Sequence, residues 1–67
     1  MQIQQLRYLV AAAEHGSFRA AAQHLFVSQS SLSVAIKELE AEMGISIFNR
    51  SSRGISLTSE GVEFLSY

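Results

Sequence analysis

A run of short hydrogen-bonding side chains occupies positions 28–37, in the order Ser-Gln-Ser-Ser-Leu-Ser-Val-Ala-Ile-Lys. At 100° per residue, the apolar residues of this run and of its continuation fall on one side of a helix: Leu32, Ala35, Ile36, Leu39 and Met43. Ser30, Ser33, Val34 and Lys37 form a separate stripe, and the run contains no acidic residue. An uncharged, slim helix face can approach another surface closely, as a helix entering the DNA major groove must.

The side chains at the start of this helix have the chemistry to contact bases and phosphates. Glutamine pairs in bidentate fashion with adenine, and serine serves donor or acceptor positions. We therefore expect base-edge and phosphate contacts from Gln29, Ser30, Ser31 and Ser33. Ser28 caps the helix, and the amides of a helix N-terminus attract a phosphate. For any single serine, the alternative is a cap or a solvated surface position.

Cationic side chains near this run are candidate phosphate contacts, which orient a protein on DNA without reading sequence. The candidates are Arg19, Lys37, Arg50 and Arg53, with Ser17 and Ser51 beside them. The formal net charge is −1, which is unusual for a nucleic-acid binder. The acidic residues nevertheless lie outside positions 28–37 and 50–59, so the local electrostatic field around these segments differs from what the net charge suggests.

The length of 67 residues allows one small domain with a modest core. The chain has no cysteine, which excludes disulfides and thiolate metal sites. His15 and His24 have no second ligand cluster nearby, so we expect no metal. We also expect no cofactor and no enzyme activity, because no Gly-rich phosphate loop or Ser-His-acid arrangement is present. No apolar run is long enough to span a bilayer, which favours the cytoplasm.

Two further helices precede the run. Ile3, Leu6, Leu9, Val10 and Ala13 recur at helical spacing and predict a first helix with these residues in the core. That prediction leaves Tyr8 on the outer side, where it could belong to a dimer contact.

Gly16 suits the end of the first helix, and Ser17 suits the start of a second. This second helix buries Phe18, Ala21, Ala22 and Leu25. A tight connection at Phe26–Val27 leads to Ser28 and the third helix, which stops at Gly44. Two helices joined by so short a turn are typical of a helix-turn-helix.

After Gly44 the apolar period changes from helical to alternating. Ile45, Ile47, Ile55 and Leu57 flank a turn-forming segment at 49–54, which predicts a β-hairpin over about 45–57. Thr58 then suits the cap of a last helix whose apolar pattern continues to Tyr67. The predicted fold is mainly α, a winged helix-turn-helix with a three-helix core, a two-stranded wing and the start of a linker helix.

The order of these features resembles the N-terminal DNA-binding domain of LysR-type transcriptional regulators over nearly the whole chain. The matching residues are Leu6 to Val10, Gly16-Ser17-Phe18, Ala21-Ala22, Leu25, Val27-Ser28-Gln29, Leu32-Ser33, Ile36-Lys37, Leu39-Glu40, Met43-Gly44, Phe48, Arg50, Leu57-Thr58 and Gly61. The resemblance implies a DNA-binding domain at 1–58, with the helix-turn-helix at about 18–37, and a linker helix beginning at 59–67. It also implies double-stranded DNA as partner.

The same resemblance implies a dimer or tetramer in the full-length protein and a C-terminal domain that binds a small-molecule effector. Since only the start of the dimerising helix is present, we expect the 67-residue chain to be monomeric and to bind DNA weakly.

Three positions depart from the family pattern. Ser30 stands where proline is frequent, and Val34 stands where arginine is common. Val34 cannot donate to guanine, so we expect it to contact a thymine methyl group. Phe26 occupies the turn, where we expect it to pack into the core. An alternative function is a winged-helix protein-interaction module without DNA binding, since a fold does not fix a function.

Overall fold

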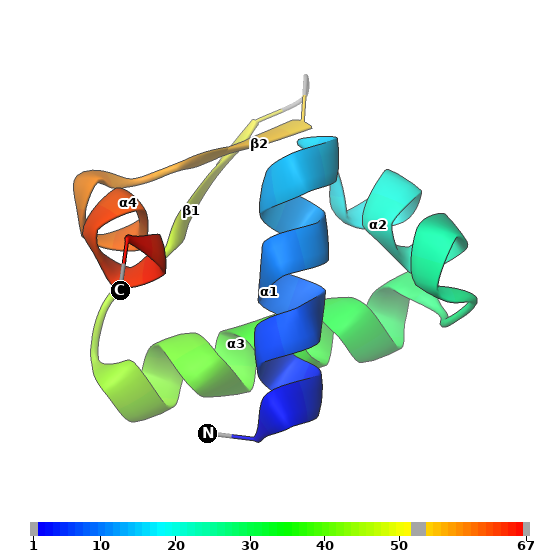
Figure 1. Ribbon diagram of the computed structural model, residues 1–67, viewed down its shortest axis with the longest axis horizontal. Coiled ribbons are helices and arrows are strands. Elements are labelled where there is room, and N and C mark those ends of the chain that lie inside the picture. The colour runs from blue at the N-terminus through cyan, green and yellow to red at the C-terminus, as the bar shows by residue number, and fades with distance from the viewer. Residues whose placement is uncertain (1, 52–53, 67) are drawn as a thin grey trace.

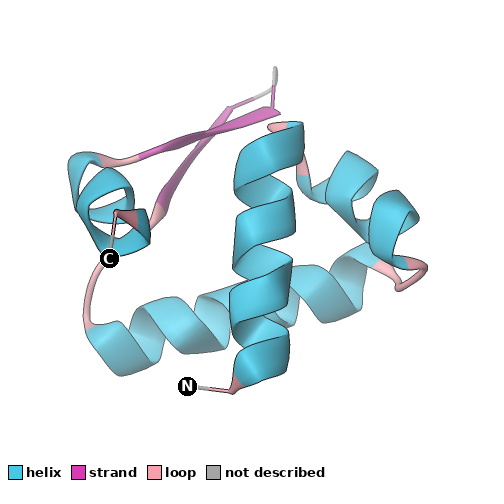
Figure 2. Cartoon of the chain, in the orientation of Figure 1, coloured by secondary structure: helices cyan, strands magenta, loops and turns pink. Residues whose placement is uncertain are grey.

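Three helices, a β-hairpin and a last helix follow one another in this computed structural model, which describes residues 2–51 and 54–66 (Figure 1). The elements are α1 (Ile3–His15), α2 (Phe18–Leu25), α3 (Gln29–Met43), β1 (Phe48–Ser51), β2 (Gly54–Leu57) and α4 (Ser59–Leu65). Within the described residues the fold is therefore mainly helical with one antiparallel hairpin (Figure 2), as the sequence predicts.

Local capping chemistry sets the ends of the helices. The hydroxyls of Ser17, Ser28 and Thr58 each accept the backbone N–H three residues further on, at 2.9, 3.1 and 2.9 Å. These bonds satisfy amides that a helix N-terminus leaves without an internal partner. Gly16 and Gly44 end α1 and α3 in the left-handed conformation, with φ of 69° and 72°. All five capping predictions are confirmed.

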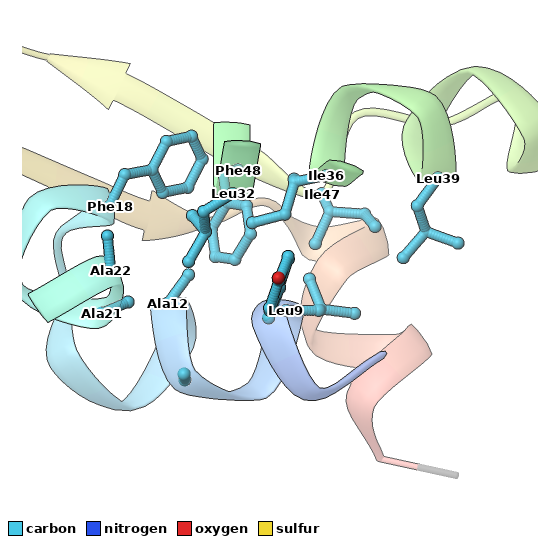
Figure 3. Packing of buried hydrophobic residues seen from close by; sticks show 12 residues of the cluster. Leu9, Ala12, Phe18, Ala21, Ala22, Leu32, Ile36, Leu39, Ile47 and Phe48 are labelled. Carbon is cyan, nitrogen blue, oxygen red and sulfur yellow. The ribbon is translucent and has the colours of Figure 1, made fainter. Parts of the chain in front are cut away.

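The core lies where α1 packs on both α2 and α3. Leu9 of α1 and Leu32, Ile36 and Leu39 of α3 are fully buried, together with Ile47 just before β1 (Figure 3). Burial of each such side chain stabilises the fold by about 1.5–3 kcal/mol. The inner side of α3 is thus held by a continuous apolar line, which fixes the direction of its outer side.

The hairpin is tied to the end of α1. β1 and β2 pair antiparallel, with Phe48 opposite Leu57, and the Ile55 N–H donates to the Gly16 carbonyl at 3.1 Å. A Cβ at Gly54 would lie 2.7 Å from that same carbonyl oxygen, and its φ is +124°. Only glycine fits this close approach without strain.

β1 begins later than the alternation of Ile45 and Ile47 predicts. Ile47 is fully buried, and its N–H donates to the Glu40 carboxylate at 2.7 Å instead of to a partner strand. The prediction of a strand from position 45 is therefore wrong, because Ile45 and Ile47 pack into the core and donate their N–H groups to Glu40 of α3.

The buried side of α1 differs from the predicted one. Ile3, Leu6 and Val10 are 79%, 38% and 41% exposed, whereas Tyr8 is only 8% exposed. The Tyr8 hydroxyl accepts a hydrogen bond from the Gln4 side chain at 2.9 Å. The predictions of a core stripe through Ile3, Leu6 and Val10, and of an outward Tyr8, are therefore wrong.

The physical reason is that α1 carries apolar residues on more than one side, so spacing alone does not select the buried one. The buried side includes Ala11 and Ala12, whose small side chains allow α2 and α3 to approach closely. Leu9 belongs to this buried side, as predicted. Met43 of α3, also predicted to share the core side, is 41% exposed.

Phe26 does not pack into the core, contrary to prediction. It is 94% exposed, and its φ of 58° makes it the left-handed residue that ends α2. Its N–H is directed to the Ala22 and Gln23 carbonyl oxygens. A left-handed residue is required to turn the chain within so short a connection, while Leu25 and Val27 on either side pack against the core.

Replacing Phe26 by glycine is expected to stabilise the protein by about 0.5–1 kcal/mol. The left-handed conformation costs a non-glycine residue about 1–2 kcal/mol. Glycine avoids this cost, and its greater loss of conformational entropy on folding costs only about 0.5–1 kcal/mol. The measurement is urea unfolding followed by circular dichroism. Gln23→Gly, at an exposed helical position, is the matched control and should destabilise; a loss of stability in Phe26→Gly would contradict the prediction.

Gly61→Ala is expected to destabilise the protein by about 2 kcal/mol, although alanine normally favours a helix. A Cβ at Gly61 would overlap the Ile47 carbonyl oxygen and meet the Ile47 and Leu57 side chains at 3.1 Å. Gly44→Ala is the control, since it has open space and only its left-handed φ costs about 1 kcal/mol. Thermal and urea unfolding of both variants test the prediction, which fails if Gly61→Ala costs no more than Gly44→Ala.

Candidate nucleic-acid interface

The outer side of α3 carries the stripe that the sequence singles out. Ser30, Val34 and Lys37 are exposed, and Ser33 is half-buried on the flank of the helix. The first turn of α3 holds no acidic residue. The structure therefore leaves three of the four stripe residues open to a partner.

A network of hydroxyl groups occupies the start of α3. The Ser28 hydroxyl accepts the Ser31 N–H and donates to the Ser31 hydroxyl at 2.8 Å, and it lies 3.3 Å from the Ser30 hydroxyl. Ser28 is thus engaged by its own helix, in the capping role. Ser30 and Ser31 are exposed, so their hydroxyl groups face outward where a phosphate or base edge could meet them.

A hollow of about 230 Å³ lies between α2, the start of α3 and the hairpin. Its lining includes five of the residues predicted to contact DNA: Ser17, Arg19, Gln29, Arg50 and Ser51. The remaining described lining residues are Phe18, Gly54 and Ile55, so the described lining carries arginine but no carboxylate. Three segments distant in sequence thus bring their polar and cationic groups to one concave surface.

A second, shallower hollow of about 350 Å³ runs along the other flank of α3, lined by Ser30, Ser31, Val34, Ala35 and Glu38. Val34, at 55% exposure, supplies the apolar wall that a methyl group could contact. Glu38 lies on the flank of the stripe and also lines this hollow. Its carboxylate bounds the acid-free surface on this side and sets a limit to how far a polyanion can extend over it.

Arg50 is already engaged within the protein. Its guanidinium lies 3.7 Å from the Glu40 carboxylate and 4.9 Å from the centroid of the Phe18 ring. The Arg50 side chain is 38% exposed, and it lines the hollow between α2 and the hairpin. It can therefore present part of its donor fork to a ligand while the rest is held by the protein.

Arg53, the remaining predicted contact, lies outside the described residues. His15 and His24 approach each other with ring centroids 4.8 Å apart. In the described part of the chain no three metal-ligating groups gather at one place. Nor is any helix there both long and apolar enough to cross a membrane.

The helix pair α2–α3, the covering helix α1 and the adjoining hairpin define a winged helix-turn-helix, the class of fold that presents one helix to a DNA groove. The model of the family described as "Bacterial regulatory helix-turn-helix protein, lysR family" matches residues 3–62. The chain belongs to this family.

Among curated relatives, the HTH-type transcriptional regulator TfdS of Cupriavidus pinatubonensis is 48% identical over 97% of this chain and 22% of its own length. A probable RuBisCO transcriptional regulator of Trieres chinensis is 52% identical over 97% of this chain and 21% of its own length. The chain thus spans about a fifth of the length of these relatives.

Two solved structures of DNA complexes share the fold. The DNA-binding domain of CbnR in complex with DNA is 44% identical with a TM-score of 0.95, covering 98% of this chain and 76% of that one. The DNA-binding domain of BenM with benA site 1 DNA is 43% identical with a TM-score of 0.94, covering 100% of this chain and 75% of that one.

Proposed function

We propose that this chain is the sequence-specific DNA-binding domain of a transcription regulator. α3 enters the major groove, and the β1–β2 wing lies on the backbone and minor groove. The observation that carries the proposal is the hollow at the start of α3, which gathers Ser17, Arg19, Gln29, Arg50 and Ser51. A surface of this kind offers base-reading side chains next to backbone-binding ones, as direct readout requires.

The proposed roles divide by chemistry. Base edges are read by Gln29, Ser30, Ser33 and the Val34 methyl groups, and phosphates are bound by Ser17, Arg19, Ser31, Lys37, Arg50 and Ser51. Arg53 is also proposed to bind a phosphate, because of its charge and its position in the sequence between the predicted strands. Ser28 acts through its cap, which holds the N-terminal amides of α3 in place. No residue is assigned a catalytic role.

The full-length protein is proposed to be a homo-oligomer, a dimer or tetramer that binds a dyad-symmetric site. Helix-turn-helix dimers place their recognition helices about 34 Å apart, or a multiple of that distance. α4 begins the linker helix in this proposal, and a C-terminal domain beyond this chain binds a small-molecule effector. We expect the 67-residue chain alone to be monomeric, and we propose that the protein acts in the cytoplasm.

A protein-interaction module is the second candidate function. The net charge of −1 and the exposed Ile3, Leu6, Val10 and Phe26 favour it, because apolar surface suits a protein partner better than a polyanion. The two functions differ in their dependence on salt and on base sequence.

Selection from random-sequence DNA duplexes tests the DNA-binding function. The chain is expected to enrich one motif. For each phosphate neutralised, a tenfold rise in salt concentration is expected to lower the binding constant by roughly 0.9 log units. Fluorescence anisotropy with the enriched duplex at several salt concentrations measures this slope. No enrichment, or salt-independent binding, would overturn the proposal in favour of the interaction module.

Ser30→Glu is expected to weaken binding to every duplex by roughly tenfold or more, because it places a carboxylate against the phosphates. The same carboxylate lies in the first turn of α3, where it favours the helix dipole, so the melting temperature should not fall. Ser59→Glu is the control, since it adds the same charge to the first turn of α4, far from the start of α3 (Figure 1). Equal binding by the two variants would contradict the placement of Ser30 on DNA.

A further inference from the structure

Glu40 connects the C-terminal half of α3 to the start of the hairpin. One carboxylate oxygen accepts the Ile47 N–H at 2.7 Å and the Phe48 N–H at 3.3 Å. The other lies 3.7 Å from the Arg50 guanidinium. The Glu40 side chain is 15% exposed, so these contacts form largely out of water, where charge-assisted hydrogen bonds are strongest.

The same cluster reaches α2 through aromatic rings. The Arg50 guanidinium lies 4.9 Å from the Phe18 ring centroid, and the Phe18 and Phe48 rings meet edge to face at 5.6 Å and 85°. Glu40 therefore contacts Arg50 of β1, and Arg50 in turn contacts Phe18 of α2. One carboxylate connects all three elements that line the hollow between α2, α3 and the hairpin.

We propose that Glu40 is a positioning residue for DNA recognition, which fixes the wing and Arg50 relative to the open face of α3. The proposal rests on the function proposed above. A duplex presents base edges and backbone at fixed separations, so a protein that reads both must hold both sets of groups in register. A frame built before binding avoids the cost of ordering the hairpin on DNA.

Positioning and plain electrostatics predict opposite effects of removing this carboxylate. An acidic residue near a DNA-binding surface repels phosphates, so its loss should strengthen binding to every duplex alike. If Glu40 instead sets the register, its loss weakens binding to the preferred duplex. Binding to a scrambled duplex, which depends on charge alone, stays the same or rises.

The experiment compares Glu40→Ala and Glu40→Gln with the unaltered chain on two probes. The probes are the duplex enriched by the unaltered chain from random DNA and a scrambled duplex of the same composition. The ratio of the two affinities is expected to fall about tenfold in Glu40→Ala, within the usual range of coupling between sites. Glu40→Gln keeps an oxygen for the Ile47 and Phe48 N–H groups but loses the ion pair, so its ratio is expected to fall by a smaller factor.

Glu14→Gln is the matched control, because it removes the same charge from an exposed position on α1; its ratio should not change. Circular dichroism and thermal unfolding establish that each variant is folded. An unchanged ratio in a folded Glu40 variant, or equal changes on both duplexes, would overturn the proposal. If Glu40→Ala does not fold, Glu40→Gln decides by the same criterion.

The outcome also separates this inference from the function on which it rests. If the unaltered chain enriches no duplex, the DNA-binding function fails before any variant is measured. If the chain enriches a duplex and the Glu40 variants keep the full affinity ratio, DNA binding stands and the positioning role of Glu40 is wrong.

Discussion

The fully buried line of Leu32, Ile36 and Leu39 is the constraint on which the rest of the structure depends. Because these side chains commit one side of α3 to the core, the opposite side has a single direction in space. A helix held by only part of this line could roll, and its exposed stripe would lose its orientation. The orientation of the candidate DNA-reading surface is therefore a consequence of core packing, before any contact with a ligand.

The second constraint is the frame around the hairpin, which is built from polar contacts as well as apolar ones. The Gly16 carbonyl holds the Ile55 N–H, and the Glu40 carboxylate holds the Ile47 and Phe48 N–H groups. A two-stranded hairpin is marginally stable by itself. Anchors at its start and on its second strand give it a defined place next to α3, and they turn a flexible extension into part of the candidate site.

The sequence predicts those features that local chemistry determines. Helix ends follow from Ser17, Ser28 and Thr58 because a cap needs only its own backbone three residues away. The buried side of α3 follows from spacing because its apolar residues largely share one side. α1 carries apolar residues on several sides, and the choice among them depends on where small residues such as Ala12 meet α2 and α3. That choice is tertiary, and spacing cannot make it.

The same distinction applies to the candidate site. The stripe of Ser30, Val34 and Lys37 is a property of one helix and can be read from spacing. The hollow lined by Arg19, Gln29 and Arg50 depends on how three elements pack together. The sequence therefore predicts these residues as DNA contacts but does not predict that they lie close together. Phe26 is a third case, in which the backbone conformation needed to end α2 overrides the preference of an aromatic side chain for burial.

If the proposed function holds, the charge balance makes the relative placement of base and phosphate contacts more important than in a strongly basic domain. With five lysines and arginines against six acidic residues, we expect phosphate contacts to supply little sequence-independent affinity. The Glu40 carboxylate, 3.7 Å from the Arg50 guanidinium, offsets part of its positive charge. This lowers the attraction of Arg50 for phosphate but fixes the position of its guanidinium. A domain of this kind gains affinity chiefly when base and backbone contacts form together. In the proposed oligomer, pairing two copies on one duplex would multiply a selective interaction instead of a nonspecific one.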